Sequence, residues 1–495
     1  MSTRRSFLKS VPACGLAGLG LRPVTAEETK IASDIVQFSD NIEPLVRLIE
    51  DTSRDKLIEE IARRVQSGLS YQKLLAALLL AGVRNVQPRP AVGFKFHAVL
   101  VVNSAHIASV ASRNEDRWLP IFWALDNFKG SQAQDVREGN WTMAPVNETL
   151  VPDSRTARGQ FTEAMDQWDE EKADVAIAGL CRSAGANEIF ELFARYGIRD
   201  FRSIGHKAIF VANSYRTLQT IGWQHAEPVL RSLTYALQNH EGQPNPATSD
   251  LDADRSWRRN QERATKIRKF WTTGKLDDNA TRDLLGTLRT GTADDASDQV
   301  VELLNAEISP QSIYDALFLA AGELLMRQPG IVALHAMTTT NAFWFAYRMA
   351  ADDTTRKLVL LQNAAFITMF RDAMAGRGNV NDRSILALEA GDKQSASVEE
   401  IFQLIGNDTP KAAEQALAFL ANTDSAERMI EQARHLVFLK GNDSHDYKFS
   451  SAVLEDFYHI SPQWRNRYLA SSVFNLRGAA ARDNGIVDRI RSAFA

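Results

Sequence analysis

Four histidines stand at the start of apolar, helix-like stretches and recur at long, similar intervals. They are His97, His206, His335 and His445, which lie 109, 129 and 110 residues apart along the chain. A histidine at a helix N-terminus lies near the positive end of the helix dipole, which favours the neutral imidazole ring. Neutral imidazole binds transition metals and acts as a general base. The four residues are therefore candidate metal ligands.

Two arrangements of these histidines are compatible with the sequence. In the first, the four helix starts converge and the rings lie within about 10 Å of one another around one ion, since a metal–nitrogen bond is about 2 Å long. In the second, each histidine caps or packs within its own unit, and the four are spread along a groove. No HExxH or HxH motif supports the first arrangement. The positions of the four rings in space distinguish the two.

Charged residues close to two of these histidines are candidates for catalysis. Arg216 follows His206 by ten residues, and Asp446 and Lys448 lie within three residues of His445. We predict catalytic roles for Arg216, Asp446 and Lys448. The alternative for the last two is a solvated helix surface, which is the usual place for a cluster of charges.

Asparagines follow three of the histidines at nearly constant spacing. Asn213 lies seven residues after His206, and a helix brings such a pair to the same face. Asn103 and Asn341 follow their histidines at six residues, which turns them about 120° away from that face. This offset holds if the histidines are already helical, so the three asparagines are only imperfectly equivalent.

The segments that carry the histidines have the pattern of paired helices. Apolar residues recur at helical spacing through most of the chain, and no segment alternates strictly between polar and apolar residues. Residues 99–102 have the composition of a buried strand, but we expect a helix there because the corresponding segments are longer and less β-branched. Pro120 lies 23 residues after His97, and Pro228 lies 22 residues after His206, which indicates repetition.

This pattern predicts an all-α chain built from four repeated units of about 110 to 130 residues. The units would form either an α-solenoid or a closed toroid. Their expected boundaries are roughly residues 40–140, 160–240, 295–375 and 395–480.

Composition limits the classes of partner and ligand. The 495 residues carry a formal net charge of −4 and no concentrated basic region, so we expect no binding to nucleic acid. No run of 18 apolar residues is present, so we expect no transmembrane helix in the mature chain. Beyond the leader described next, Cys181 is the single cysteine. Any metal would have to be held by imidazole, carboxylate or amide groups.

The first 26 residues have the order of a twin-arginine signal peptide. Residues 3–9 (Thr-Arg-Arg-Ser-Phe-Leu-Lys) match the export motif, an apolar stretch follows, and Val24, Thr25 and Ala26 form a small-residue cleavage site. We therefore expect the export machinery as a partner, a periplasmic or otherwise exported location, and a mature all-α repeat domain at residues 27–495. This route carries folded proteins, often with a cofactor inserted, which favours a bound metal or cofactor.

Short stretches around the four histidines resemble a family of functionally uncharacterised bacterial helical-repeat proteins exported by the twin-arginine route. More distantly, the repeated plan is similar to questin oxidase-like proteins. That likeness implies an all-α oxidoreductase that acts on a small organic substrate, by analogy with the oxygen-dependent opening of an aromatic polyketide ring. The stretches that carry the resemblance are residues 93–97, 202–210, 327–335 and 445–452.

Two functions follow from these observations. The first is an exported oxidoreductase-like or metal-assisted enzyme with a His-lined central site and a small-molecule substrate. The second is a non-catalytic helical-repeat scaffold that binds a protein or polymer in the cell envelope. Convergent histidines would favour the first, and separated histidines the second.

Overall fold

The computed structural model describes residues 34–88, 94–238, 242–391, 397–421 and 425–495. These ranges contain 22 α-helices, four short 3₁₀-helices and no strand beyond one isolated bridge between Lys275 and Ile308. The prediction of an all-α fold is therefore confirmed. The predicted signal peptide, residues 1–26, lies outside the described residues.

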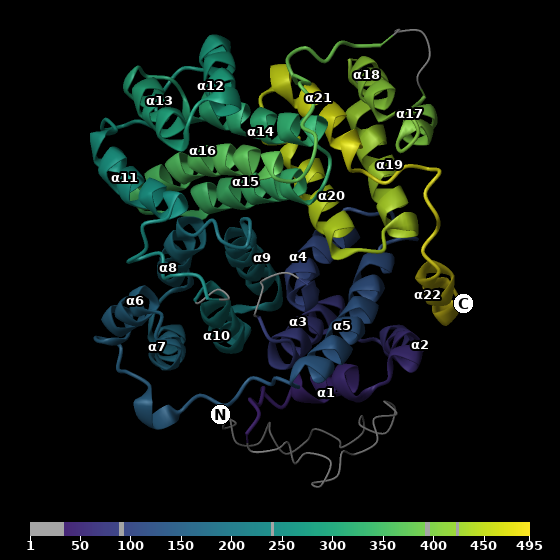
Figure 1. The fold of residues 1–495 in the computed structure, drawn as a ribbon. Helices are drawn as coiled ribbons and strands as arrows, with labels where there is room; N and C mark the ends of the chain where they lie inside the picture. Colours follow the sequence, from purple (N-terminus) through teal and green to yellow (C-terminus); the bar gives the residue numbers. More distant parts are fainter. Residues whose placement is uncertain (1–33, 89–93, 239–241, 392–396, 422–424) are drawn as a thin grey trace, which may run out of the picture.

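Short connections join most of the helices, so that neighbours in sequence are usually neighbours in space (Figure 1). The 3₁₀-helices are η2 (Phe94–Phe96), η3 (Glu148–Leu150), η4 (Trp223–His225) and η5 (Ser472–Phe474). The α-helices are α1 (Glu43–Asp51), α2 (Arg54–Gln66), α3 (Tyr71–Asn85), α4 (His97–Val110), α5 (Leu119–Glu138), α6 (Ala157–Gln167), α7 (Glu170–Ser183), α8 (Ala186–Arg199), α9 (His206–Ile221), α10 (Ala226–Leu237), α11 (Asp252–Lys266), α12 (Asp278–Thr290), α13 (Ala293–Asn305), α14 (Pro310–Arg327), α15 (Ile331–Met349), α16 (Asp353–Ala375), α17 (Val398–Leu404), α18 (Thr409–Leu420), α19 (Ser425–Lys440), α20 (Ser444–Asp456), α21 (Pro462–Ser471) and α22 (Ile486–Phe494).

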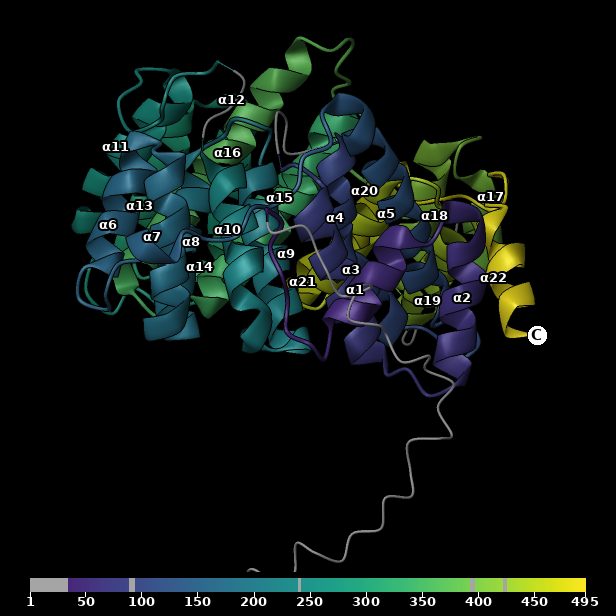
Figure 2. The ribbon, with the colours of Figure 1, turned by 90° about the horizontal axis from the view of Figure 1, so that it is seen from below.

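Four helices, α4, α9, α15 and α20, form the centre of the molecule (Figures 1 and 2). Each packs against two of the others, in the cyclic order α4, α9, α15, α20 and back to α4. Hydrogen bonds join corresponding positions of neighbouring helices: Asn103 donates to Asn213 at 3.3 Å, and Ser451 donates to the Ser104 carbonyl at 2.9 Å. Corresponding positions can meet in this way only if the helices run in the same direction, so their N-termini lie at one end.

The local sequence explains why these central helices are buried. Helix α4 is apolar on nearly every side, and such a helix is stable only when other elements surround it. Residues 99–102 are buried within it, which confirms the helix expected there. Although several described helices are this apolar, none combines the length and hydropathy that a membrane-crossing helix requires.

Flanking helices surround the centre in a similar way around each central helix. Helices α3 and α5 pack on α4, α8 and α10 on α9, α14 and α16 on α15, and α19 on α20. This arrangement is compatible with a fourfold repeat, while the boundaries given above for the four units stay a prediction. Helices α6, α7 and α11 to α13 lie outside these pairs, on the side of the molecule that Figure 1 shows at the left.

The two ends of the described chain meet. Helix α22 packs on α2, and Arg489 binds Glu59 through two hydrogen bonds of 2.6 and 2.7 Å. The side chain of Gln66 also donates to the carbonyl of Phe494 at 3.3 Å. Figure 1 shows α22 beside α2, so the last helix closes the arrangement onto the first ones.

Candidate metal centre

The four histidines converge at the N-terminal end of the central helices. The Nε2 atom of His206 lies 3.0 Å from Nε2 of His97 and 2.9 Å from Nε2 of His335. The ring of His445 has its centroid 4.5 Å from that of His97 and 5.3 Å from that of His335. One ligand atom from each residue lies within 4.8 Å of the others. The structure therefore shows the convergent arrangement and not the separated one.

Each histidine comes from the beginning of a different central helix. His97 and His206 are the first residues of α4 and α9, His445 is the second residue of α20, and His335 is in the second turn of α15. His97, His206 and His335 are buried, with His335 fully inaccessible, whereas His445 is partly exposed. Because the helices are parallel, four equivalent sequence positions supply four rings to one point.

Backbone carbonyls fix the tautomers of two rings. The Nδ1 atom of His206 lies 2.6 Å from the carbonyl oxygen of Ser203, and Nδ1 of His335 lies 2.6 Å from that of Ile331. A carbonyl oxygen only accepts hydrogen bonds, so both Nδ1 atoms carry the proton. In the neutral rings, the two Nε2 lone pairs then face each other across 2.9 Å. A shared cation between them removes this repulsion.

His445 has a carboxylate partner in place of a carbonyl. Its Nδ1 donates to Oδ1 of Asp443 at 2.6 Å, and its Nε2 is buried with no hydrogen-bond partner among the described residues. This hydrogen bond is the main reason that the pKa of Asp443 is lowered to about 2. A carboxylate in this position orients the ring and raises the basicity of the opposite nitrogen, as is common for metal-binding histidines.

Burial keeps two of the rings in the neutral form. It lowers the pKa of His335 well below 6.5, and the neighbouring His206 and Lys448 lower it further. Burial likewise lowers the pKa of His97, with a second contribution from Lys448. The neutral form is the one that binds a metal ion.

A strained loop presents His206 to the centre. Ser203, Ile204 and Gly205 have consecutive positive φ angles of 63°, 46° and 81°. A β-branched residue such as Ile204 rarely adopts this region, and strain of this kind is held only where the surrounding structure enforces it. A Cβ atom on Gly205 would lie 2.0 Å from Oγ1 of Thr339, so the loop sits directly on α15.

Buried ion pairs hold this loop in place. Arg202 binds Asp200 at 3.0 Å and Asp254 at 2.7 Å, with all three side chains almost fully inaccessible. Lys207, next to His206 and fully buried, donates to Asp200 and to the carbonyl of Leu237. Breaking a buried pair of this kind is costly because it leaves an uncompensated charge.

A small polar cavity, here called the axial cavity, lies between the central helices on the C-terminal side of the histidines. Its volume is about 10 Å³, which is room for roughly one water molecule. The side chains of Asn103, Asn213 and Asn341 all line it, although their spacings from the histidines differ by one residue. Each central helix packs against two others, so residues from more than one position per turn can face the space between the helices. The other lining residues are Ser104, Ile107, Ile209, Arg216, Thr338, Lys448, Ser451 and Ala452.

The three candidate catalytic residues occupy different surroundings. Lys448 is buried in the cavity wall, and its Nζ atom has no hydrogen-bond partner among the described residues. Burial lowers the pKa of Lys448 to about 7, against an opposing effect of Asp443. Arg216 also lines the cavity, but it forms an ion pair with Glu455 at 2.9 Å.

Asp446 is not among the residues that line the cavity, and it supports the helix that carries His445. Its carboxylate accepts from the backbone N–H groups of Asn442 and Asp443 at 3.1 and 3.2 Å, and it binds Arg477 at 2.6 Å. These contacts cap the N-terminus of α20. Catalytic roles for Asp446, Lys448 and Arg216 stay predictions.

Acidic residues at the other end of α20 were not among the sequence candidates. Asn341 donates to Glu455 at 2.8 Å and to the fully buried Asp456 at 2.7 Å, and Tyr468 donates to Asp456 at 2.8 Å. Burial raises the pKa of Asp456 well above its usual range. The only signal in the sequence is two adjacent acids ten and eleven residues after His445, a pattern that is typical of helix surfaces.

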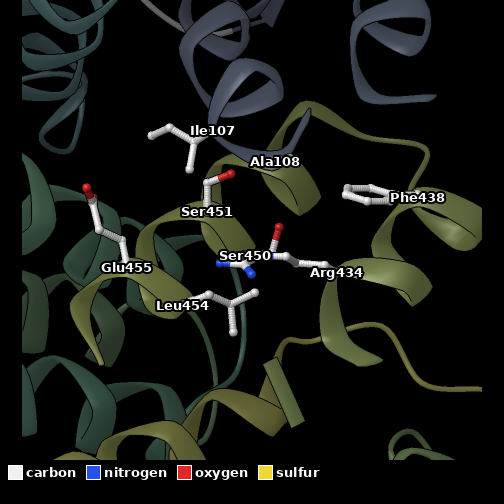
Figure 3. Close-up of a pocket in the computed structure, with 8 residues that line it drawn as sticks. All are labelled: Ile107, Ala108, Arg434, Phe438, Ser450, Ser451, Leu454 and Glu455. Carbon is white, nitrogen blue, oxygen red and sulfur yellow. The ribbon is translucent and has the colours of Figure 1, made fainter. Parts of the chain in front are cut away.

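A second small cavity adjoins the first between α4, α19 and α20 (Figure 3). Its volume is about 30 Å³, and it shares Ile107 and Ser451 with the axial cavity. Arg434 extends toward Ser450 and Ser451 in Figure 3. These two cavities between the central helices therefore suit only molecules of a few atoms.

Comparisons with protein-family models, with curated proteins and with solved structures find no match to this chain. The functional argument therefore rests on the geometry of the site.

Proposed function

We propose that this protein binds one first-row transition-metal ion through His97, His206, His335 and His445 and uses it in a reaction on a small molecule. The observation that carries the proposal is the contact between His206 and His335, whose Nε2 lone pairs face each other at 2.9 Å with both Nδ1 atoms bonded to carbonyls. Two neutral rings avoid this contact unless a cation lies between them.

The distances between the rings support a shared ion. With metal–nitrogen bonds of about 2.0 to 2.1 Å, two ligand atoms lie about 2.9 Å apart at a right angle and about 3.4 Å apart at a tetrahedral angle. The observed separations of 2.9 and 3.0 Å are close to the first value. Imidazole ligands suit zinc, copper, iron and nickel, and right-angled sites are typical of copper(II) and nickel(II).

The surroundings of the histidines favour catalysis over a purely structural ion. A catalytic metal needs a position for an exogenous ligand, and the unpartnered Lys448 in the cavity wall lies three residues after His445 on α20. A redox-active ion in this place would make the protein an oxidoreductase, which is the activity implied by the resemblance to questin oxidase-like proteins. The clustering of the histidines is the feature that the scaffold hypothesis does not require.

Export by the twin-arginine route belongs to the same proposal. A buried site with three inaccessible rings fills most readily while the chain folds. A protein that is exported after folding would carry its ion with it to the periplasm.

X-ray absorption spectroscopy of the protein reconstituted with copper, nickel, iron or zinc tests the proposal. We expect one ion per chain, with about four imidazole nitrogens at about 2 Å. The iron and copper forms are then screened for uptake of dioxygen with small aromatic substrates. Failure of all four ions to bind a folded sample at micromolar concentration would contradict the proposal.

A further inference from the structure

An amine without a hydrogen-bond partner among the described residues lies in the wall of the axial cavity. Lys448 is 2% exposed, lines the cavity, and has no hydrogen-bond partner for Nζ among the described residues. An ammonium group in this state lacks its three hydrogen-bond acceptors, which is costly in a low-dielectric interior. Other buried lysines in the protein are satisfied: Lys207 binds Asp200 and Lys95 binds Asp135. No described residue therefore supplies a hydrogen-bond acceptor for the Nζ atom of Lys448.

The cavity wall has polar groups but no carboxylate among its described residues. Arg216, the second cation there, is compensated by Glu455 at 2.9 Å. Asn103, Asn213 and Asn341 bring amide groups to the same space. An anion entering the cavity would thus meet hydrogen-bond donors and no opposing negative charge in its wall.

The N-terminal ends of the central helices, which carry the histidines, are also electropositive. The N-termini of α4, α9 and α20 begin at or within two residues of their histidines, and helix N-termini carry a partial positive charge. Neutral imidazole ligands would leave the charge of a divalent ion uncompensated. The Asp443 carboxylate accepts a hydrogen bond from Nδ1 of His445.

We propose that the axial cavity binds a small anion of one or two heavy atoms at the ammonium group of Lys448, which lies three residues after the metal ligand His445. The inference rests on the metal centre proposed above and names the class of ligand that completes it. Hydroxide has the required size and charge, and so do the anionic forms of dioxygen. The cavity volume of about 10 Å³ excludes larger anions such as carboxylic acids with a ring.

Binding of fluoride to the cobalt(II)-loaded protein tests the inference. Fluoride resembles hydroxide in size and charge, and the paramagnetic ion broadens the ¹⁹F NMR signal of the bound ion. We expect saturable broadening in the wild type in chloride-free buffer. The Lys448→Met variant should retain one cobalt per chain and bind fluoride at least about tenfold more weakly, because it loses the protonatable amine that would pair with the anion.

Two further variants keep the test independent of one substitution. Lys440→Met is the matched control, since Lys440 lies on the neighbouring helix and is paired with Asp483 at 2.6 Å, so its fluoride affinity should equal that of the wild type. Ala452→Val fills the cavity from its wall and should exclude fluoride while cobalt binding is kept.

The possible failures are distinguishable. Cobalt binding without fluoride binding, or equal fluoride affinity in Lys448→Met, would overturn the anion site and leave the metal centre standing. A folded wild type that binds no cobalt would overturn both proposals.

Discussion

The rings of His206 and His335 face each other through their Nε2 atoms at 2.9 Å, and each ring donates from Nδ1 to a carbonyl three or four residues earlier in its own chain. The acceptors Ser203 and Ile331 belong to the segments that present the two rings, so each ring orientation is fixed by a local contact. Both segments therefore hold their rings in the orientation that brings the two Nε2 atoms together. A cation between these two atoms makes the contact favourable.

Metal binding should stabilise the folded protein. An ion that binds only the folded state at 100 times its dissociation constant adds about 2.7 kcal/mol to the free energy of unfolding. We expect the preferred ion to raise the thermal midpoint in calorimetry and a chelator to lower it. A His335→Leu variant removes a fully buried ligand and should lose this response. A chelator-sensitive midpoint in the variant would place the ion elsewhere.

Gly205→Ala should weaken both the fold and the site. Gly205 has φ of 81°, and a Cβ atom there would lie 2.0 Å from Oγ1 of Thr339. We expect a loss of about 1 to 3 kcal/mol in the free energy of unfolding, measured by denaturant titration, together with weaker metal binding because the His206 loop shifts.

The matched control is Gly159→Ala, at an exposed helical position of α6 where a Cβ atom meets nothing within 4 Å. Alanine is the better helix former, so this variant should gain about 0.5 to 1 kcal/mol. Equal effects of the two substitutions would contradict the role given to the loop.

Asp456 should make the folded protein less stable as the pH rises. Burial, with a smaller effect of Glu455, raises the pKa of this carboxyl well above 3.8. Between the unfolded and the folded pKa the folded state binds more protons, so the free energy of unfolding falls by at most about 1.4 kcal/mol per pH unit over that window. Asp456→Asn should flatten this dependence while keeping a partner for Tyr468 and Asn341.

The measurement for Asp456 is urea unfolding of wild type and variant at intervals from pH 4 to 9. Asp153→Asn is the control, because Asp153 is exposed and its pKa is lowered by backbone hydrogen bonds. That carboxyl is ionised in both states above pH 5, so its replacement should leave the slope unchanged. Parallel curves for wild type and Asp456→Asn would refute the assignment.

In the metal-free protein, His97 and His335 should make the folded state less stable as the pH falls. Burial lowers the pKa of His97 and His335 well below 6.5, so the folded state binds fewer protons than the unfolded state. Their contribution to the free energy of unfolding is present above about pH 6.5 and is lost as the pH falls below that value. In the Asp456→Asn background, stability should drop from pH 7 to 5, and His335→Leu should make that drop smaller. An unchanged drop would show that His335 does not titrate on unfolding.

The sequence predicts the helices well because their signals are local. The run of residues 99–102 was expected to be helical from its counterparts elsewhere in the chain, and it is. The positions of His97, His206 and His445 at helix starts follow from the breaks that precede them. Local signals of this kind need no knowledge of how distant segments pack.

The site could be predicted only in part because its completion depends on distant contacts. Whether His97 meets His206, 109 residues later, depends on the cyclic packing of four helices, so the separated arrangement remained open. Asp446 and Lys448 are close in sequence, yet one caps its helix and the other enters the cavity. The buried state of Asp456 depends on Asn341 and Tyr468, which no spacing indicates.

Elemental analysis of the protein purified after native export tests the central claim most directly. The comparison is a variant in which His206 and His335 are both changed to Ala, with circular dichroism as the control for folding. We predict about one iron, copper, nickel or zinc ion per wild-type chain and none in the variant. A well-folded wild type without metal, or a variant that retains the same ion, would contradict the claim that these four histidines form a metal centre.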